Sequence, residues 1–261
     1  MGGANTSLAE VVSGAPLGGK QKKPHRFSGT AAVSNLGDDP NWTGHEFSAA
    51  ITYAYGRLAW DPSLSAEDVT REWVDATWAP DDEASSDAMV KLLLNSWEAY
   101  ENYTAPLGIG FICGGDHYNP DPAHRQSLTN ATSKYIGYNR PAYAGTYNGA
   151  VASALESVET TPEELLLAFH NVPYTHKLNA ARRNLSVIDF IYSSHKAGAA
   201  TASSYVQTWT SLQGKLDFGA YGPGTFEVVK KRLQFGASEA QRFSGIITKY
   251  FTNLTGIVPP P

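Results

Sequence analysis

The stretch FEVVKKRLQFGASEAQRFSGIITKYFTNL, from Phe226 to Leu254, decides the fold class. Its apolar residues recur at intervals of three and four, which places them on one face of a helix. They are Phe226, Val229, Leu233, Ala237, Ala240, Phe243, Ile247 and Phe251. The stretch therefore predicts a long helix with a continuous buried stripe.

Similar patterns predict helices over most of the preceding chain. They are expected from about Gly44 to Trp60, after Ser65, after the segment APDDE, near Ala150 to Val158, after Thr161 and across Val187 to Leu212. Two of these helices begin with capping-box spacing, Thr43 with Glu46 and Thr161 with Glu164. The class predicted from these patterns is mainly α.

The helix expected from Gly44 should be stopped by Asp61 and Pro62. Its periodic apolar residues are expected to belong to the core, and Trp60 is expected to be a packing anchor. The core face comprises Phe47, Ile51, Ala54, Tyr55 and Leu58. The apolar positions expected in the next two helices are Val69, Trp73, Ala76, Met89, Leu92, Leu93, Trp97 and Tyr100.

The remaining segments are a short strand, a tail and a long loop. TAAVSNLG, residues 30–37, is a run of small residues that ends in glycine and predicts a buried strand. Residues 1–29 are rich in glycine, lysine and proline and are expected to form a flexible amino-terminal segment. Residues 106–148 lack a stable period, and a loop of this length is typical of functional or disordered segments.

Composition excludes several classes of protein. With 42% hydrophobic residues the chain can bury a substantial core. Its formal net charge is −5, and its lysines and arginines form no basic stripe that could bind phosphate backbones. No apolar run has the length of a membrane span, and the first residues lack the order of a signal peptide. A single cysteine, Cys113, excludes an internal disulfide. We expect neither nucleic acid nor a membrane as partner.

The chain has more glycosylation sequons than chance predicts. Six positions fit N-x-[ST], where composition alone gives about two. They are Asn5, Asn41, Asn102, Asn130, Asn184 and Asn253. Asn41 lies in an aromatic stretch, so the other five are the glycosylation candidates, and the excess favours an extracellular parent protein.

The densest group of titratable side chains is the loop GGDHYNPDPAHR. It contains Asp116, His117, Tyr118, Asp121, His124 and Arg125. Two histidines and a carboxylate are a possible zinc set, but neither the H-x-x-x-H spacing nor a cysteine pair is present. No G-x-S-x-G elbow is present either. We expect no metal and no cofactor, and a metal hydrolase built on this loop is the less favoured alternative.

Two further groups have simpler interpretations. His170 and His176 flank NVPYT at a helix end, where a capping or packing role is expected. The carboxylates of PDDE and PEE, residues 80–83 and 162–164, are expected to be cap and helix-dipole partners. No pair of carboxylates is recognised as an acid and a base.

Six blocks occur in an order that resembles a known family. They are NWTGHEF, YAYGRLAWDP, PLGIG, DHY, EELLLAFHNVPYTHKL and TWTSLQGKLD. From about Gly29 to the end, the chain resembles the carboxy-terminal region of fungal-like glycoside hydrolase family 67 α-glucuronidases. The resemblance implies removal of glucuronic acid, or its 4-O-methyl ether, from xylan-derived oligosaccharides with inversion. It also implies a central (β/α)₈ barrel and a helical carboxy-terminal domain used in dimerisation.

The resemblance assigns a part of that architecture to this chain. Residues 30–261 would be the helical domain, and residues 30–60 would resemble the last βα unit of the barrel. The catalytic carboxylates would lie upstream, so the chain is expected to be inactive alone. The residues expected near the substrate cleft are Asn41, Trp42, His45, Asp116, His117, Tyr118, Arg125 and Arg140. The implied partners are acidic xylo-oligosaccharides and a second copy of the chain.

The sequence departs from the family pattern in the loop after DHY and in the HNVPY segment, among other places. Ala123 stands near a position where bacterial members have tryptophan, and Asn171 replaces a histidine. An alternative interpretation is a stand-alone helical carbohydrate-binding or assembly module without catalysis. In either case residues from about Ser65 to Leu254 are expected to fold on their own.

Overall fold

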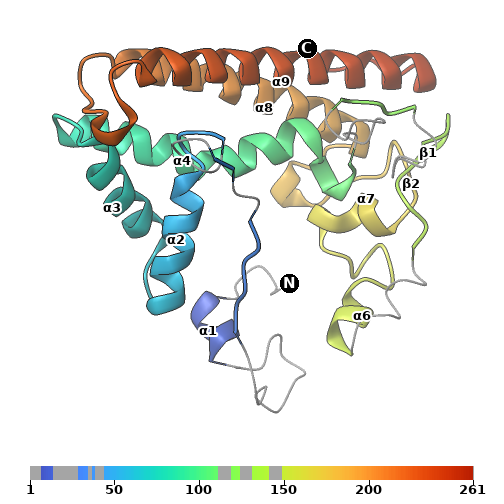
Figure 1. Ribbon diagram of the computed structural model, residues 1–261. Coiled ribbons are helices and arrows are strands. Elements are labelled where there is room, and N and C mark those ends of the chain that lie inside the picture. The colour runs from blue at the N-terminus through green and yellow to red at the C-terminus, as the bar shows by residue number, and fades with distance from the viewer. Residues whose placement is uncertain are drawn as a thin grey trace. The chain divides into compact units, whose positions relative to one another are not determined.

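The computed structural model describes residues 7–13, 29–34, 37–38, 44–110, 119–123, 131–140 and 149–260. These residues are mainly helical (Figure 1), which confirms the predicted class. The chain divides into two compact units, Met1–Asn95 with Gln207–Arg232 and Ser96–Val206 with Leu233–Pro261. In the part of the chain described, no helix has the length and apolar character that a membrane crossing requires.

The first unit is built from short helices and the ends of three long ones. Its elements are α1 (Leu8–Val12), α2 (Ala49–Trp60), α3 (Ala66–Trp78), η4 (Gly219–Tyr221) and parts of α4 (Glu83–Thr104), α8 (Val187–Ser211) and α9 (Thr225–Thr255). Trp78 is fully buried at its centre. The rings that surround Trp78 at centroid distances of 5.4–6.0 Å are Phe47, Trp73, Trp209, Phe218 and Tyr221. This aromatic cluster is the core of the unit.

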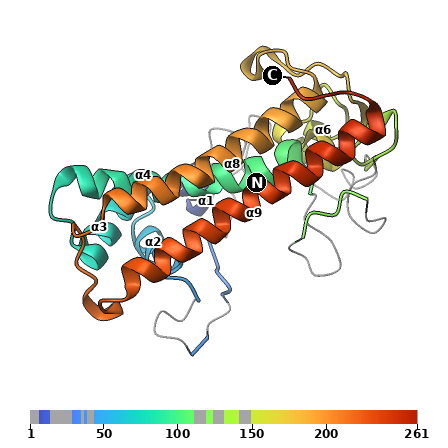
Figure 2. The same ribbon diagram turned by 90° about the horizontal axis from the view of Figure 1, so that it is seen from above.

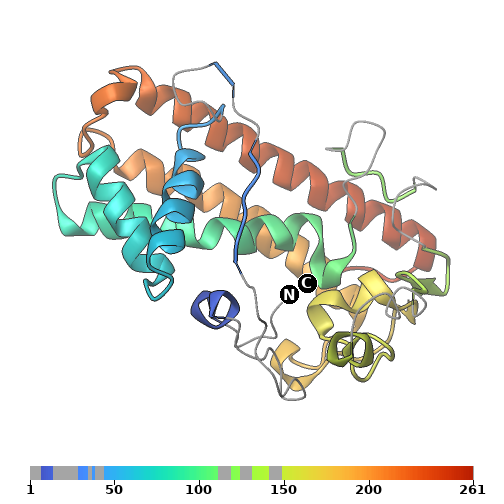
Figure 3. The ribbon, with the colours of Figure 1, turned by 60° about the horizontal axis from the view of Figure 1, so that its bottom comes forward.

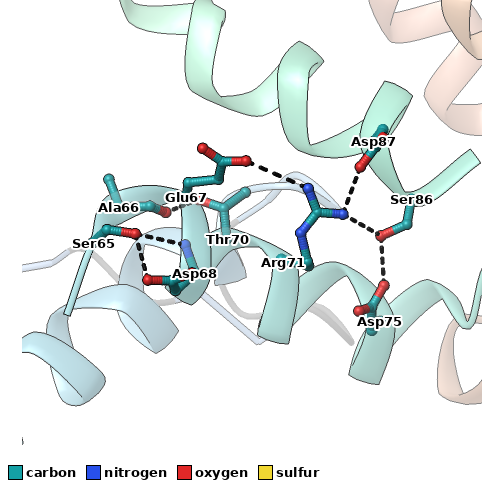
Figure 4. Close-up of polar contacts among 9 residues, drawn as sticks. All are labelled: Ser65, Ala66, Glu67, Asp68, Thr70, Arg71, Asp75, Ser86 and Asp87. Atoms are coloured by element: carbon teal, nitrogen blue, oxygen red, sulfur yellow. Dashed lines mark hydrogen bonds and ion pairs between the residues drawn. The ribbon is translucent and has the colours of Figure 1, made fainter. Parts of the chain in front are cut away.

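Helix α3 begins where the sequence predicts. The Ser65 hydroxyl accepts from the Asp68 amide at 3.0 Å and donates to Asp68 Oδ2 at 2.7 Å, which is a side-chain cap (Figure 4). Farther along α3, Arg71 Nη1 lies 2.7 Å from Asp87 Oδ1 at the start of α4. Ser86 completes this connection by donating to Asp75 Oδ1 at 2.6 Å. Polar contacts therefore join α3 to α4.

The second unit combines the other parts of the long helices with a small two-stranded sheet. Its further elements are η1 (Pro106–Gly108), β1 (Tyr135–Ile136), α6 (Ala150–Ala154), η2 (Glu163–Leu165), α7 (Leu166–Phe169), β2 (Val172–Pro173) and η3 (Ala180–Arg182). The strands pair antiparallel, with Tyr135 opposite Pro173 and Ile136 opposite Val172. Buried side chains from α7, β2, α8 and α9 form one hydrophobic cluster around them.

Small residues allow the helices of this unit to pack closely. A Cβ at Gly198 of α8 would lie 2.7 Å from the Tyr103 amide nitrogen and 2.8 Å from the Ala99 carbonyl oxygen of α4. Alanines of α8 meet alanines of α9 in a second small cluster, Ala199 and Ala202 with Ala237 and Ala240. The two longest helices, α8 and α9 (Figure 2), thus lie side by side in this unit.

The apolar stripe of α9 confirms the helix predicted from Phe226. Seven of its eight predicted positions are buried, and Leu233 is half-buried. The helix α8 also agrees with its predicted range to within one residue. Of the positions expected in α3 and α4, Val69, Trp73, Met89 and Leu92 are buried. Ala76, Trp97 and Tyr100 are exposed, so their expected burial is wrong.

Helix α2 differs from its prediction in its first residue and in the burial of its side chains. It begins at Ala49 rather than Gly44, and its first residue follows a turn at 46–48 without a side-chain cap. None of its residues is buried, and Ile51, Tyr55 and Trp60 are 75%, 37% and 87% exposed. The expected burial is therefore wrong for Ile51 and Tyr55 of the core face and for the Trp60 anchor. Of the other predicted core positions, Phe47 packs in the aromatic cluster, and Ala54 and Leu58 are half-buried. The helix lies beside α3 (Figure 3), where Arg57 is paired with Glu72 at 2.7 Å.

The predicted strand at TAAVSNLG does not form in the residues that are described. Residues 29–34 have no regular secondary structure and are exposed, with Val33 fully so. A strand needs neighbours for its amides and carbonyls, and here the Thr30 carbonyl accepts instead from the Tyr55 hydroxyl at 3.0 Å. Leu36 lies outside the described residues.

Three smaller expectations also change. The amino-terminal segment contains a helix, α1, because Ser7 and Glu10 form a capping box with the Glu10 amide 3.2 Å from the Ser7 hydroxyl. The capping box predicted from Thr161 and Glu164 does not form, since the Thr161 hydroxyl donates to the Ser157 carbonyl at 2.8 Å. The helix expected to extend to Val158 ends at Ala154.

Candidate functional site

Two of the eight residues predicted near the substrate cleft lie in the described part of the chain. His45 belongs to the first unit and Arg140 to the second. The other six lie outside the described residues: Asn41, Trp42, Asp116, His117, Tyr118 and Arg125. The site is therefore built from the surroundings of His45 and of Arg140, each within its own unit.

His45 lies in the turn that precedes α2. Its Nδ1 accepts from the Phe47 amide at 3.0 Å, so the neutral ring carries its proton on Nε2. Burial lowers the pKa of His45, the nearby Glu46 carboxylate opposes this, and the Arg232 guanidinium lowers the pKa further. The imidazole is thus held neutral at pH 7, as an acceptor within its own turn.

The same turn is fixed by a residue from α9. Arg232 Nη1 donates to the Gly44 carbonyl and lies 3.6 Å from Glu46 Oε2. Glu46 is only 7% exposed, so its charge is met by the guanidinium rather than by water. The Phe47 ring packs edge-on against Trp78 and Trp209 at 5.7 and 5.6 Å. Charge and aromatic packing together anchor the turn.

Arg140 follows β1 in the second unit. Its guanidinium lies 3.9 Å above the Tyr138 ring, and its amide donates to the Phe169 carbonyl at 2.8 Å. The Asn171 side-chain amide donates to the Gly137 carbonyl at 3.1 Å. Asn171, which replaces a histidine of the family pattern, therefore helps to hold the segment that carries Arg140.

Gly137 permits this close approach. Its φ is +105°, and a Cβ there would lie 2.2 Å from the His170 carbonyl oxygen. His170 is itself buried and its Nε2 lies 2.8 Å from the Thr161 hydroxyl oxygen. Burial lowers the pKa of His170. This agrees with the packing role predicted for this histidine.

Glu163 and Glu164 serve in structural ion pairs. Arg182 Nε lies 3.0 Å from Glu163 Oε2, and Arg182 Nη2 lies 2.7 Å from Glu164 Oε1. Glu163 also accepts from the Asn179 amide at 2.6 Å. The expectation that these two carboxylates are cap partners of their own helix is therefore wrong, because they bind the later segment at 179–182.

The predicted metal loop is largely outside the described residues. Asp121, which is described, accepts from the Ala123 amide at 3.2 Å. Over the described ranges there is no group of three or more histidine, cysteine, aspartate or glutamate residues that could hold a metal ion.

The glycosylation candidates differ in exposure. Asn184 and Asn253 are exposed, whereas Asn102 is half-buried on α4. Asn5, Asn130 and the excluded Asn41 lie outside the described residues. Asn184 also has a backbone role, since it adopts a φ of +53° and its amide donates to the Asn179 carbonyl at 3.1 Å.

Comparison with protein families gives the decisive observation. The family model described as "Glycosyl hydrolase family 67 C-terminus" matches residues 43–260. The chain belongs to this family. Membership confirms the resemblance seen in the sequence blocks and agrees with the helical class.

Similar proteins with curated names are fungal α-glucuronidases. The chain is 35% identical to "Probable alpha-glucuronidase A" of Aspergillus clavatus and to "Alpha-glucuronidase A" of Emericella nidulans, with 98% of the chain covered in both cases. It is 34% identical to "Alpha-glucuronidase A" of Aspergillus tubingensis over 96% of the chain. The chain spans about 30% of the length of the first two relatives and 29% of the third.

Sequence reasoning missed the role of Arg232 and Glu46. Glu46 was assigned to a capping box, although its carboxylate is turned inward toward Arg232. Arg232 lies between apolar positions of α9, where a charged residue is typical of a solvent-facing helix surface. The one indication of this turn in the sequence was Gly44, which adopts a φ of +75° there.

Proposed function

We propose that this chain is the carboxy-terminal helical domain of an α-glucuronidase. The parent enzyme would hydrolyse (4-O-methyl)glucuronic acid side chains from xylan-derived oligosaccharides with inversion. Family membership and the names of the relatives support the enzyme class. Because the chain spans about 30% of those relatives, we assign the catalytic groups to the remaining part of the parent enzyme.

The observation that carries the proposal is the exposed apolar face of α2. Ile51 and Tyr55, four positions apart and therefore on one helix face, are 75% and 37% exposed, on a helix without a buried residue. Soluble proteins rarely leave large apolar side chains grouped on a surface unless another surface covers them. In the proposed enzyme α2 packs against the preceding barrel, as the resemblance of residues 30–60 to a last βα unit implies.

The chemistry of inversion supports the same division. An inverting glycosidase uses one carboxylic acid to protonate the leaving oxygen and a second carboxylate, about 6.5–9.5 Å away, to activate water. Glu46 faces Arg232, and Glu163 and Glu164 face Arg182. These carboxylates are engaged in structural contacts with arginines of this chain rather than arranged as an acid and a base. We therefore expect the chain to be inactive alone.

The experiment uses aldouronic acid oligosaccharides and measures free glucuronic acid. The purified chain should release none. The amino-terminal seven-tenths of the Emericella nidulans enzyme, fused to this chain, should release it. Release by the chain alone would contradict the assignment of the catalytic groups to the remaining part.

A matched pair of variants tests the contribution of α2 in that fusion. Ile51→Ser should reduce glucuronic acid release, because it removes an apolar contact with the barrel. Phe235→Ser, on α9, is the control because Phe235 is 68% exposed. Equal activities of the two variants would show that exposure at Ile51 has no special meaning.

A second function is favoured by exposed aromatic residues on α4. Trp97 is 73% exposed and Tyr100 is 43% exposed, and their spacing of three places them on one helix face. Such a face suits stacking on sugar rings or contact with a second copy of the chain. The alternative is therefore a carbohydrate-binding or assembly module without catalysis.

Two measurements separate these functions. Calorimetric titration with acidic xylo-oligosaccharides should saturate for a binding module and should show little heat for the domain we propose. Light scattering should detect the homodimer that we also propose for the parent enzyme. Loss of the dimer in Trp97→Ser would place this aromatic face in the dimer contact.

The sequons favour secretion of the parent enzyme. Finding glycan at Asn184 or Asn253 would test this proposal.

A further inference from the structure

The turn before α2 is connected to a distant part of the chain. Arg232 of α9 donates from Nη1 to the carbonyl of Gly44, although 188 positions separate the two residues. The same Nη1 lies 3.6 Å from the buried Glu46 carboxylate. One guanidinium therefore meets both a backbone oxygen and a side-chain charge of the same turn.

The remaining contacts give this turn a defined geometry. Gly44 has a φ of +75°, a conformation that side chains other than glycine rarely adopt. Phe47 packs edge-on against the rings of both Trp78 and Trp209, and its amide donates to His45 Nδ1. The turn is thus held from inside by Phe47 and from α9 by Arg232.

We infer that Arg232 is a positioning residue for the edge of the substrate cleft. It acts through the Gly44–Glu46 turn, the segment that carries His45. The assignment of that segment to the cleft rests on the proposed function. The connection between Arg232 and the turn does not.

An arginine suits this role better than a lysine. A guanidinium is planar and offers several N–H groups in a fixed arrangement, whereas an ammonium is a compact charge on a flexible stem. The charge of Arg232 also contributes to keeping His45 neutral, because it lowers the pKa of the imidazole. Charge and geometry at position 232 therefore have separable effects.

The test compares Arg232→Met and Arg232→Lys with the wild-type chain, by NMR and without substrate. Arg242→Met is the matched control, because Arg242 is on the same helix but is paired with Glu239 at 2.6 Å. Arg232→Met should increase exchange of the Phe47 amide about tenfold while leaving Ile247 on the buried stripe unchanged. It should also raise the pKa of His45, because the opposing Glu46 charge remains.

The lysine variant separates the two effects. Arg232→Lys should retain the wild-type pKa of His45 and should protect the Phe47 amide only in part. The inference is overturned if Arg232→Met leaves both readouts unchanged, or if it accelerates all amides equally, which would mean support of the fold alone. Because neither readout uses catalysis, a failed glucuronidase assay would count against the proposed function and not against this connection.

Discussion

Helices α2 and α9 have the same kind of apolar periodicity and opposite surroundings. The stripe of α9 is buried over most of its length, whereas α2 has no buried residue. Periodicity identifies which side chains share a helix face, but burial depends on whether another surface is present to cover that face. The difference indicates that α2 lies at the margin of the core formed by this chain.

The largest test of this comparison uses two tryptophans. Trp78→Ala should lower the free energy of unfolding by about 3–5 kcal/mol, because it empties the centre of the aromatic cluster. Trp60→Ala at the end of α2 should change it by less than about 0.5 kcal/mol. Urea unfolding of both variants measures the difference. Similar losses would mean that Trp60 is buried in solution.

A glycine at a helix contact gives the next largest effect. Gly198→Ala should destabilise the chain by about 3 kcal/mol, because the new Cβ meets backbone atoms of Ala99 and Tyr103 that cannot move independently. The urea midpoint should fall with little change in slope. An unchanged midpoint would show that α4 and α8 are farther apart in this unit than described.

Acidification should reveal the buried histidine of α8. His195 is fully buried and stacks on Phe243, and burial lowers its pKa to about 3 against an opposing hydrogen bond with the Tyr103 backbone. The unfolded chain binds this proton near pH 6.5, so the stabilisation is present above that pH and is lost as pH falls. At pH 5.5 this histidine should lower the free energy of unfolding by about 1.4 kcal/mol relative to its value well above pH 6.5.

The contribution is isolated by comparing unfolding free energies at pH 7.5 and 5.5 in wild type and His195→Leu. The leucine variant should lose less stability than wild type over this interval. Equal losses would mean that His195 titrates normally in the folded chain.

The smallest effect is a gain of stability on α2. A Cβ at Gly56 meets no atom within 4 Å, and its backbone is helical. Gly56→Ala should therefore stabilise the chain by about 0.5–1 kcal/mol, since alanine favours the helix. A melting temperature that falls instead would indicate that another surface of this chain covers α2.

Local signals in the sequence predicted the elements that are determined locally. Ser65 starts α3 because its hydroxyl satisfies an amide of the first turn, and the long stripe defines α9 because its residues lie on one face. The start of α2 could not be predicted in this way, since Glu46 is engaged by Arg232 from the other end of the chain. Likewise, nothing near Trp60 in sequence indicates that its face lacks a cover.

The candidate site was predictable only in part. Block resemblance selected His45 and Arg140, and the structure supplies defined hydrogen bonds or ring contacts for both. Their supporting residues are distant in sequence, as with Asn171 at Gly137 and Arg232 at Gly44. Such pairs depend on tertiary packing, which periodicity and capping rules do not contain.

Hydrogen exchange of the chain at a concentration where it is monomeric tests the central claim most directly. We predict that amides of residues 31–34 exchange as in an unstructured peptide, and that α2 exchanges about a hundredfold faster than the buried parts of α8 and α9. That result would place the core of this chain in α3, α4, α8 and α9 and their neighbours. Protection of α2 and residues 31–34 equal to that of α9 would contradict the account, because it would make them part of the core of this chain.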